Sequence, residues 1–131
     1  MASFKDAKPA ISKALNSSDP VERYWGATVC ASFGGEAVSL YKELELLTVD
    51  TQAFVRSRAI VALSRMGKVN PVPLMKESLQ IAGSGAEPLL ILNDITYLQE
   101  SNLGVHFNLQ ESDILQKCSV TDWRLKYLSA K

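Results

Sequence analysis

The feature that most constrains this chain is an internal repeat of 33 residues. When residues 22–34 are set over residues 55–67, Arg23 falls on Arg56 and Gly34 falls on Gly67. A third, weaker copy ends at residues 95–99, 32 residues after the second, with Pro88 at the arginine position and Gln99 at the glycine position. Repeats of this length are typical of stacked architectures, in which each unit is too thin to bury its apolar face alone.

Helix start and stop signals recur within each copy. Asp19-Pro20 provides an N-cap carboxylate followed by a proline in the first turn, and Gly34-Gly35 provides an exit, so we predict a helix over residues 20–33. Its apolar residues recur at the 3.6 period with small residues beside them, and we expect little of it to face water. Similar reasoning predicts helices over residues 4–15, 36–48, 52–66, 71–82 and 86–98, the last with Leu89 on its apolar stripe.

These elements predict an all-α fold in one domain, residues 1–131, built as a right-handed α–α superhelix of about three helix pairs. The repeats span roughly residues 4–34, 35–67 and 71–99. Residues 103–131 differ, because Leu103, Val105, Phe107 and Leu109 alternate as in an extended segment, and Thr121-Asp122 then begins a short helix. We expect this segment to cap the apolar face of the last repeat.

Composition excludes several classes of protein. With 131 residues, 47% of them apolar, and 14 basic against 14 acidic side chains, the chain resembles an ordinary globular domain. The zero net charge argues against a nucleic-acid partner or a membrane surface. The first nine residues have neither the apolar core nor the cleavage site of a secretory signal, which favours a cytoplasmic location by default.

Three strings carry a resemblance to a known family: residues 19–27 (Asp-Pro-Val-Glu-Arg-Tyr-Trp-Gly-Ala), residues 54–59 (Phe-Val-Arg-Ser-Arg-Ala) and residues 92–98. They resemble the HEAT-type helical repeats that follow the catalytic domain in some bacterial sulfatases, over roughly residues 15–100. The resemblance implies a ladder of hydrogen bonds between neighbouring repeats, made by Asp19, Arg23, Asp50 and Arg56. It also implies a non-catalytic interaction or scaffold module that contacts a partner protein or its parent enzyme domain, and a periplasmic or extracellular location if that enzyme is secreted.

Candidate catalytic residues are few. Sulfatases use a cysteine or serine in a Cys/Ser-x-Pro-x-Arg setting, and neither Cys30 nor Cys118 has such neighbours. We interpret Cys30 as an inert core thiol and favour buried packing over a reactive or disulfide role for Cys118. His106, the single histidine, is expected to face solvent, and the acidic residues lack metal-ligand spacing. The sequence therefore predicts no enzyme activity, no metal and no cofactor.

A binding surface is the remaining hypothesis. We expect the second helix of each pair to line a shallow concave face that carries Glu22, Tyr24, Ser57 and Arg58. The alternative is a bilin-lyase-type HEAT protein, which would need a pocket for a large conjugated ligand beside Tyr24 and Arg56. Residues 51–81 contain five basic side chains and one acidic side chain, whereas residues 82–113 contain five acidic side chains and no lysine or arginine. The basic stretch suits either an anionic partner, such as a sulfated glycan or an acidic protein face, or pairing with the acidic stretch, which we favour.

Overall fold

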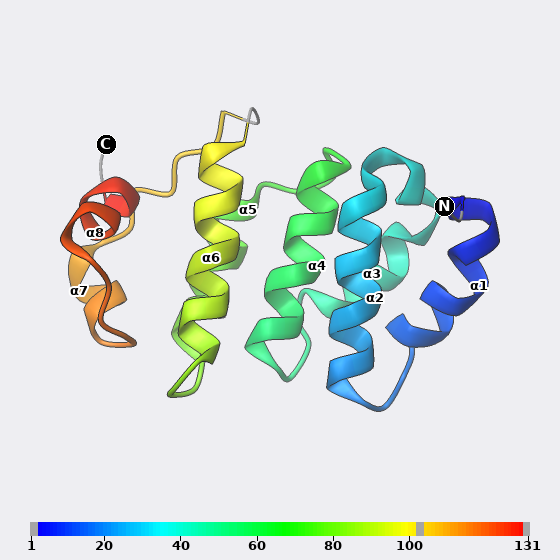
Figure 1. Ribbon diagram of the computed structural model, residues 1–131, viewed down its shortest axis with the longest axis horizontal. Helices are drawn as coiled ribbons and strands as arrows, with labels where there is room; N and C mark the ends of the chain where they lie inside the picture. Colours follow the sequence, from blue (N-terminus) through cyan, green and yellow to red (C-terminus); the bar gives the residue numbers. More distant parts are fainter. Residues whose placement is uncertain (1–2, 102–103, 130–131) are drawn as a thin grey trace.

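The computed structural model describes residues 3–101 and 104–129, and this part of the chain is helical with no β-strand. Figure 1 shows α2, α4 and α6 side by side, with α3 and α5 behind them and α7 and α8 at the far end of the row. None of the described helices is long and apolar enough to span a bilayer. The elements are α1 (Phe4–Leu15), α2 (Pro20–Phe33), the 3-10 helix η1 (Gly34–Leu40), α3 (Tyr41–Leu47), α4 (Ala53–Arg65), α5 (Pro71–Ile81), α6 (Glu87–Glu100), α7 (Glu111–Leu115) and α8 (Asp122–Ser129).

Local capping determines where several helices begin. The Asp19 carboxylate accepts a hydrogen bond from the Val21 amide at 2.9 Å, and Pro20 occupies the first turn of α2. At the start of α5 the Asn70 side chain accepts from the Val72 amide at 3.1 Å, again with a proline in the first turn. These side chains satisfy N–H groups that have no partner inside the helix, so the helices start where the caps stand.

The predicted single helix over residues 36–48 is wrong. The chain instead forms η1 and then α3, with a break in backbone angles at Leu40. Gly34, where φ is +60°, turns the chain out of α2 directly into the tighter helix. A 3-10 helix has three residues per turn, so Gly34, Ala37 and Leu40 lie on one face, and all three are buried.

The surface of α2 also differs from the expectation. Its buried residues are the small ones, Gly26, Ala27, Cys30 and Ala31, whereas Val21 is 64% exposed and Trp25 49% exposed. Gly26 lies so close to α1 that a Cβ there would be 3.1 Å from the Leu15 backbone nitrogen. Small side chains allow the neighbouring helices to approach closely, and the larger residues are left facing solvent.

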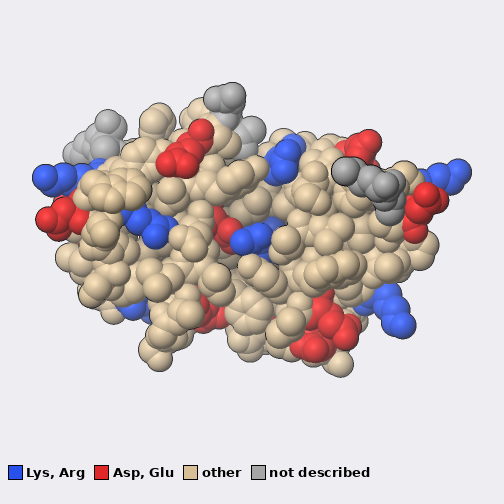
Figure 2. Space-filling view, viewed as in Figure 1, with Lys and Arg blue, Asp and Glu red and all other residues tan. Residues whose placement is uncertain are grey.

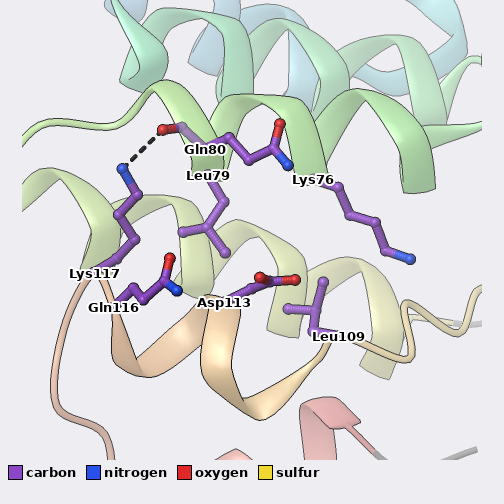
Figure 3. Close-up of a pocket in the computed structure, with 7 residues that line it drawn as sticks. All are labelled: Lys76, Leu79, Gln80, Leu109, Asp113, Gln116 and Lys117. Carbon is purple, nitrogen blue, oxygen red and sulfur yellow. Dashed lines mark hydrogen bonds between the residues drawn. The ribbon is translucent and has the colours of Figure 1, made fainter.

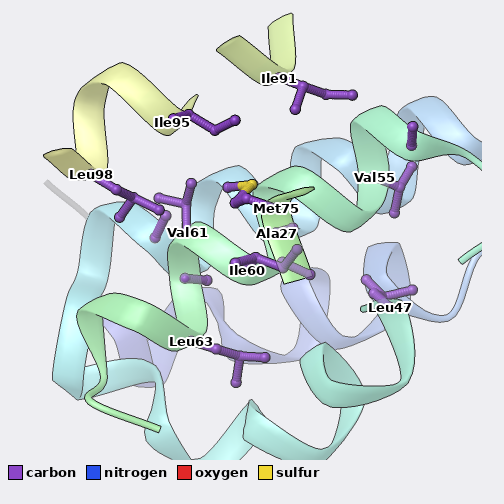
Figure 4. Close-up of a cluster of buried hydrophobic side chains, with 14 of the residues drawn as sticks. Ala27, Leu47, Val55, Ile60, Val61, Leu63, Met75, Ile91, Ile95 and Leu98 are labelled. Atoms are coloured by element: carbon purple, nitrogen blue, oxygen red, sulfur yellow. The ribbon is translucent and has the colours of Figure 1, made fainter. Parts of the chain in front are cut away.

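Helix α4 forms the centre of the molecule, because it packs against α2, α3, α5 and α6. Val55, Ala59, Ile60 and Leu63 are fully buried. Figure 4 shows how this core draws side chains from α2 through α6 into one cluster. On α6, the predicted stripe is buried at Ile91, Leu92, Ile95 and Leu98, but Leu89, which was placed on it, is exposed.

The C-terminal segment covers the α6 end of this row. Residues 104–110 are neither helix nor strand, yet Phe107 and Leu109 are buried while His106 and Asn108 are exposed. Two backbone amides hold the segment: Phe107 donates to the Gln99 side chain at 3.2 Å, and Leu109 donates to the Leu128 carbonyl at 3.0 Å. The short helix α7 was not anticipated. Of the predicted cap, residues 103, 130 and 131 lie outside the described residues.

Candidate functional site

An ion pair joins Arg23, near the start of α2, to Asp50 in the loop before α4. Arg23 donates from Nε to Asp50 Oδ1 at 2.8 Å and from Nη2 to Oδ2 at 3.2 Å. Its Nη1 donates to the Ser17 carbonyl at 3.0 Å, and Asp50 also accepts from the Gln52 amide at 2.9 Å. Both side chains are largely buried. One arginine thus connects two successive repeats through their loops.

Arg56 repeats part of this arrangement in the next unit. Its Nε donates to the Asp50 carbonyl at 2.6 Å, six residues earlier in the chain, at the same spacing as the bond from Arg23 Nη1 to the Ser17 carbonyl. Its Nη1 reaches Glu77 of α5 at 3.3 Å. The structure therefore brings together Arg23, Asp50 and Arg56, three of the four expected ladder residues. The fourth, Asp19, only caps its own helix. Arg56 instead donates to Glu77 of the third unit, a residue that the sequence analysis did not single out.

The four residues assigned to the interaction face do not form one surface. Ser57 is fully buried, so it cannot contact a partner. Glu22 is exposed but lies about 200° around α2 from Tyr24, on the other side of the helix. Tyr24 and Arg58 do lie together, with the guanidinium carbon 5.1 Å from the ring centroid. The Tyr24 ring also meets Phe54 edge to face, with centroids 5.5 Å apart.

Asp94 of α6 is the residue that organises this region, and the sequence reasoning gave it no such role. Its side chain is 8% exposed, and its Oδ2 accepts from Ser57 Oγ at 2.5 Å and from Arg58 Nε at 3.2 Å. Burial raises the pKa of the Asp94 carboxyl above its ordinary value, against the opposing effects of the Ser57 hydrogen bond and the Arg58 charge. The available signal was an acidic residue beside the apolar positions of a helix, in Leu92-Asn93-Asp94-Ile95.

A hollow of about 320 Å³ lies above this cluster. Figure 2 shows the side of the molecule formed by α2, α4 and α6, which is mostly uncharged with a small group of charged side chains near its centre. We call the outward residues of these helices the α2/α4/α6 face. The hollow is lined by Thr28, Ala31 and Ser32 of α2, Arg58, Val61 and Arg65 of α4, and Asn93, Asp94 and Tyr97 of α6.

Two other hollows differ in character. One of about 580 Å³ opens between α1 and α2, with Ile11, Trp25, Val29 and Phe33 among its mostly apolar lining. The other, of about 230 Å³, lies between α5 and α7 (Figure 3). There Lys117 donates from Nζ to the carbonyls of Gln80 at 2.7 Å and Ala82 at 3.0 Å. This lysine thereby attaches the C-terminal segment to the end of α5. Neither Tyr24 nor Arg56, the residues expected beside a dye-sized pocket, lines any of the three hollows.

Both cysteines are free thiols. Burial, with a smaller contribution from the negative charge of Glu43, raises the pKa of Cys30 to about 12. Burial also raises the pKa of Cys118, and the nearby Arg124 charge opposes that rise. Over residues 3–101 and 104–129 no group of three or more histidine, cysteine or acidic side chains is arranged to hold a metal ion.

No protein-family model matches the chain, and neither the curated proteins nor the solved structures compared with it are similar to it. The residues and their geometry are therefore the basis for assigning a function.

Proposed function

We propose that this chain is a non-catalytic protein-interaction module that binds a partner protein on its α2/α4/α6 face. The observation that carries the proposal is the combination, on one side of the molecule, of exposed apolar residues, few charges and a shallow hollow. Val21 and Trp25 of α2 and Tyr97 of α6 are 64%, 49% and 45% exposed. Aromatic side chains of this kind dominate the energetics of protein interfaces.

The fold proposed with this function is a right-handed superhelix of HEAT-type repeats. It is supported by the 33-residue repeat, by the contacts of α2 with α4 and α4 with α6, and by two arginines that each contact the next unit, Arg23 at Asp50 and Arg56 at Glu77. In such stacks the second helices of the pairs share one face, which makes an extended contact surface. The resemblance to the helical appendage of sulfatases makes a neighbouring catalytic domain one candidate partner.

The centre of the face is held rigidly before any partner arrives. Arg58 is fixed by Asp94 on one side and by the Tyr24 ring on the other, and Asp94 is fixed in turn by Ser57. Side chains that are already ordered lose less conformational entropy on binding. The side chains of Ser57 and Cys30 are both fully buried, and burial keeps the Cys30 thiol protonated at neutral pH.

An unbiased peptide-display library, selected on the immobilised protein, tests this function. Selected peptides are added to ¹⁵N-labelled protein, and the amide shifts are mapped by NMR. We expect the perturbed amides to cluster on α2, α4 and α6, and Tyr97→Ser to weaken binding severalfold. Leu46→Ser is the matched control, because Leu46 is also an exposed apolar residue but lies on α3. A selection without binders, or binders that map to α3 and α5, would overturn the proposal.

A further inference from the structure

The hollow between α2, α4 and α6 contains more positive than negative charge. Arg58 and Arg65, two turns apart on α4, both line it, and Asp94 is its only acidic lining residue. Asp94 is already paired with Arg58 at 3.1 Å. Among the described residues, no carboxylate lies within ion-pair distance of Arg65. One positive charge in the hollow is thus left without a counter-ion.

Most hydrogen-bonding groups left over in the hollow are donors. Arg58 contacts Asp94 through Nε, and in the described part of the chain its terminal amino groups donate to no protein atom. Arg65 donates from Nη1 to the Ala31 carbonyl at 2.7 Å. Within the described residues its Nη2 donates to no protein atom. The Asn93 carbonyl oxygen accepts from Arg124 at 2.8 Å, so its amide nitrogen remains to donate. A ligand that satisfies these groups has to supply acceptors.

Both oxygens of the carboxylate that lines the hollow are already paired, and two hydroxyl groups of the hollow have no hydrogen left to donate. Asp94 Oδ2 accepts two hydrogen bonds, and its Oδ1 lies against Arg58. The hydroxyl groups of Thr28 and Ser32 donate to carbonyls within their own helix. A cationic ligand would therefore meet two guanidinium groups and no free carboxylate, and it is disfavoured.

The walls of the hollow are apolar between these polar groups, because Ala31, Val61 and the ring of Tyr97 also line it. A volume of about 320 Å³ accommodates one side chain or a small molecule, at the low end of ligand pockets. The group that fits has a short aliphatic stem and a negatively charged, planar head. A carboxylate matches the fork of a guanidinium group in this way.

We infer that the hollow is a docking site for an acidic side chain, a glutamate or aspartate, of the partner protein, held by Arg58 and Arg65. The inference rests on the proposed protein-binding function and specifies the chemistry of its partner. The α2/α4/α6 face then anchors an apolar partner residue at Tyr97, which lines the hollow, while the hollow selects for an acid beside it.

The test uses the full chain and a defined probe, N-acetyl-glutamate N-methylamide, which reproduces one glutamate residue of a peptide. The side-chain Nε–Hε signals of the arginines are followed by NMR during titration. We expect saturable shifts at Arg58 and Arg65, and no comparable shifts with the uncharged glutamine analogue. Arg65→Gln should lower the affinity for the probe about tenfold, because it removes a charge-assisted hydrogen bond. Lys13→Gln, which removes an exposed charge on α1, should leave the affinity unchanged.

A second variant does not depend on removing an arginine. Ser32→Asp places a carboxylate at an exposed position that lines the hollow, and it should compete with the probe, whereas Ser32→Asn should not. Absence of shifts at both arginines, or retention of probe affinity in Ser32→Asp, would overturn the inference. So would inorganic sulfate binding as tightly as the carboxylate probe at equal ionic strength, since that result indicates a general anion site.

The two proposals can fail separately. If the peptides selected from the display library map to the α2/α4/α6 face but carry no acidic residue that protects the arginine signals, the docking of an acid is wrong and the protein-binding function stands. If no peptide binds the face, the protein-binding function itself fails.

Discussion

Arg23 holds both carboxylate oxygens of Asp50, although the two residues are 27 positions apart in the chain. Planar guanidinium and carboxylate groups form two parallel hydrogen bonds in this geometry, which fixes direction as well as distance. Asp50 also accepts from the Gln52 amide in the turn before α4, and its carbonyl accepts from Arg56, so this single acidic residue holds two successive units of the stack together. Loss of either partner should therefore affect the whole domain rather than one helix.

Replacement of Arg23 by alanine should lower the free energy of unfolding by about 3 kcal/mol, because it leaves the largely buried Asp50 carboxylate without its counter-ion. Asp19→Ala, which removes only a helix cap, should cost about 1 kcal/mol. Urea denaturation followed by circular dichroism measures both values. Equal losses for the two variants would contradict the structural role assigned to the Arg23–Asp50 pair.

The stability of the protein should carry a pH-dependent contribution from Asp94. Its pKa is raised above 3.8 in the folded protein, so the folded state binds a proton more tightly than the unfolded chain does. Lowering the pH through the raised pKa therefore stabilises the folded state, and raising the pH removes that gain. We expect the unfolding free energy of the wild type, relative to that of Asp94→Asn, to increase as the pH falls from neutral toward 3.8.

Asp94→Asn keeps the shape of the side chain and cannot titrate, so other acids cancel in the comparison. Chemical denaturation at a series of pH values provides the measurement. A difference that shrinks as the pH falls would mean that the pairing with Arg58 outweighs burial, and the direction given for the pKa of Asp94 would be wrong.

The two thiols should differ in reactivity toward a disulfide reagent such as DTNB. Cys30 is fully buried and its pKa is raised to about 12, so almost none of it is thiolate at neutral pH. Cys118 is partly exposed and should react first. We expect one thiol to react in the native protein and the second only at the rate of unfolding, with mass spectrometry after digestion to locate each label. Rapid labelling of Cys30 would contradict its place in the core.

Gly26→Ala tests the close approach of α1 and α2. Alanine favours a helix over glycine by about 1 kcal/mol, but the new Cβ would lie 3.1 Å from the Leu15 backbone nitrogen, and overpacking costs about 1–3 kcal/mol. We expect a net loss of about 1 kcal/mol, measured by thermal or urea denaturation. Gly35→Ala is the control, because nothing lies within 4 Å of its added Cβ, and it should be neutral or slightly stabilising. Stabilisation of the protein by Gly26→Ala would show that the two helices can move apart at little cost.

The helices that could be predicted from sequence are those whose ends depend on neighbours in the chain. The Asp19 and Asn70 caps act on amides two residues away, and Pro20 and Pro71 follow them directly. The expected and observed bounds of α2, α4 and α5 accordingly agree to within about one residue, which is the usual uncertainty of a helix end. The spacing of three between Gly34, Ala37 and Leu40 is equally present in the sequence, but the pattern predicts a helix stop at Gly34 and an α-helix from residue 36 instead of a 3-10 helix.

The sequence predicted the candidate site less accurately than it predicted the helices. Of the residues expected on the interaction face, Tyr24 and Arg58 meet, while Ser57 is buried and Glu22 lies on another side of α2. The missing information was the position of Asp94, which is 37 residues from Ser57 and on a different helix. Whether Ser57 is a surface group or a buried donor depends on that acid, and periodicity within one helix does not report it.

The sequence by itself determined the repeat, the caps and the helical segments, because hydrogen bonds between residues a few positions apart settle them. Tertiary structure decided which side of each helix is covered. Gly26 and Cys30 are buried while Trp25 is exposed, because α1 and α4 approach the small residues of α2. Burial is a property of how neighbouring helices fit together, and that fit places Asp94 beneath Arg58 and leaves the positively charged hollow open beside it.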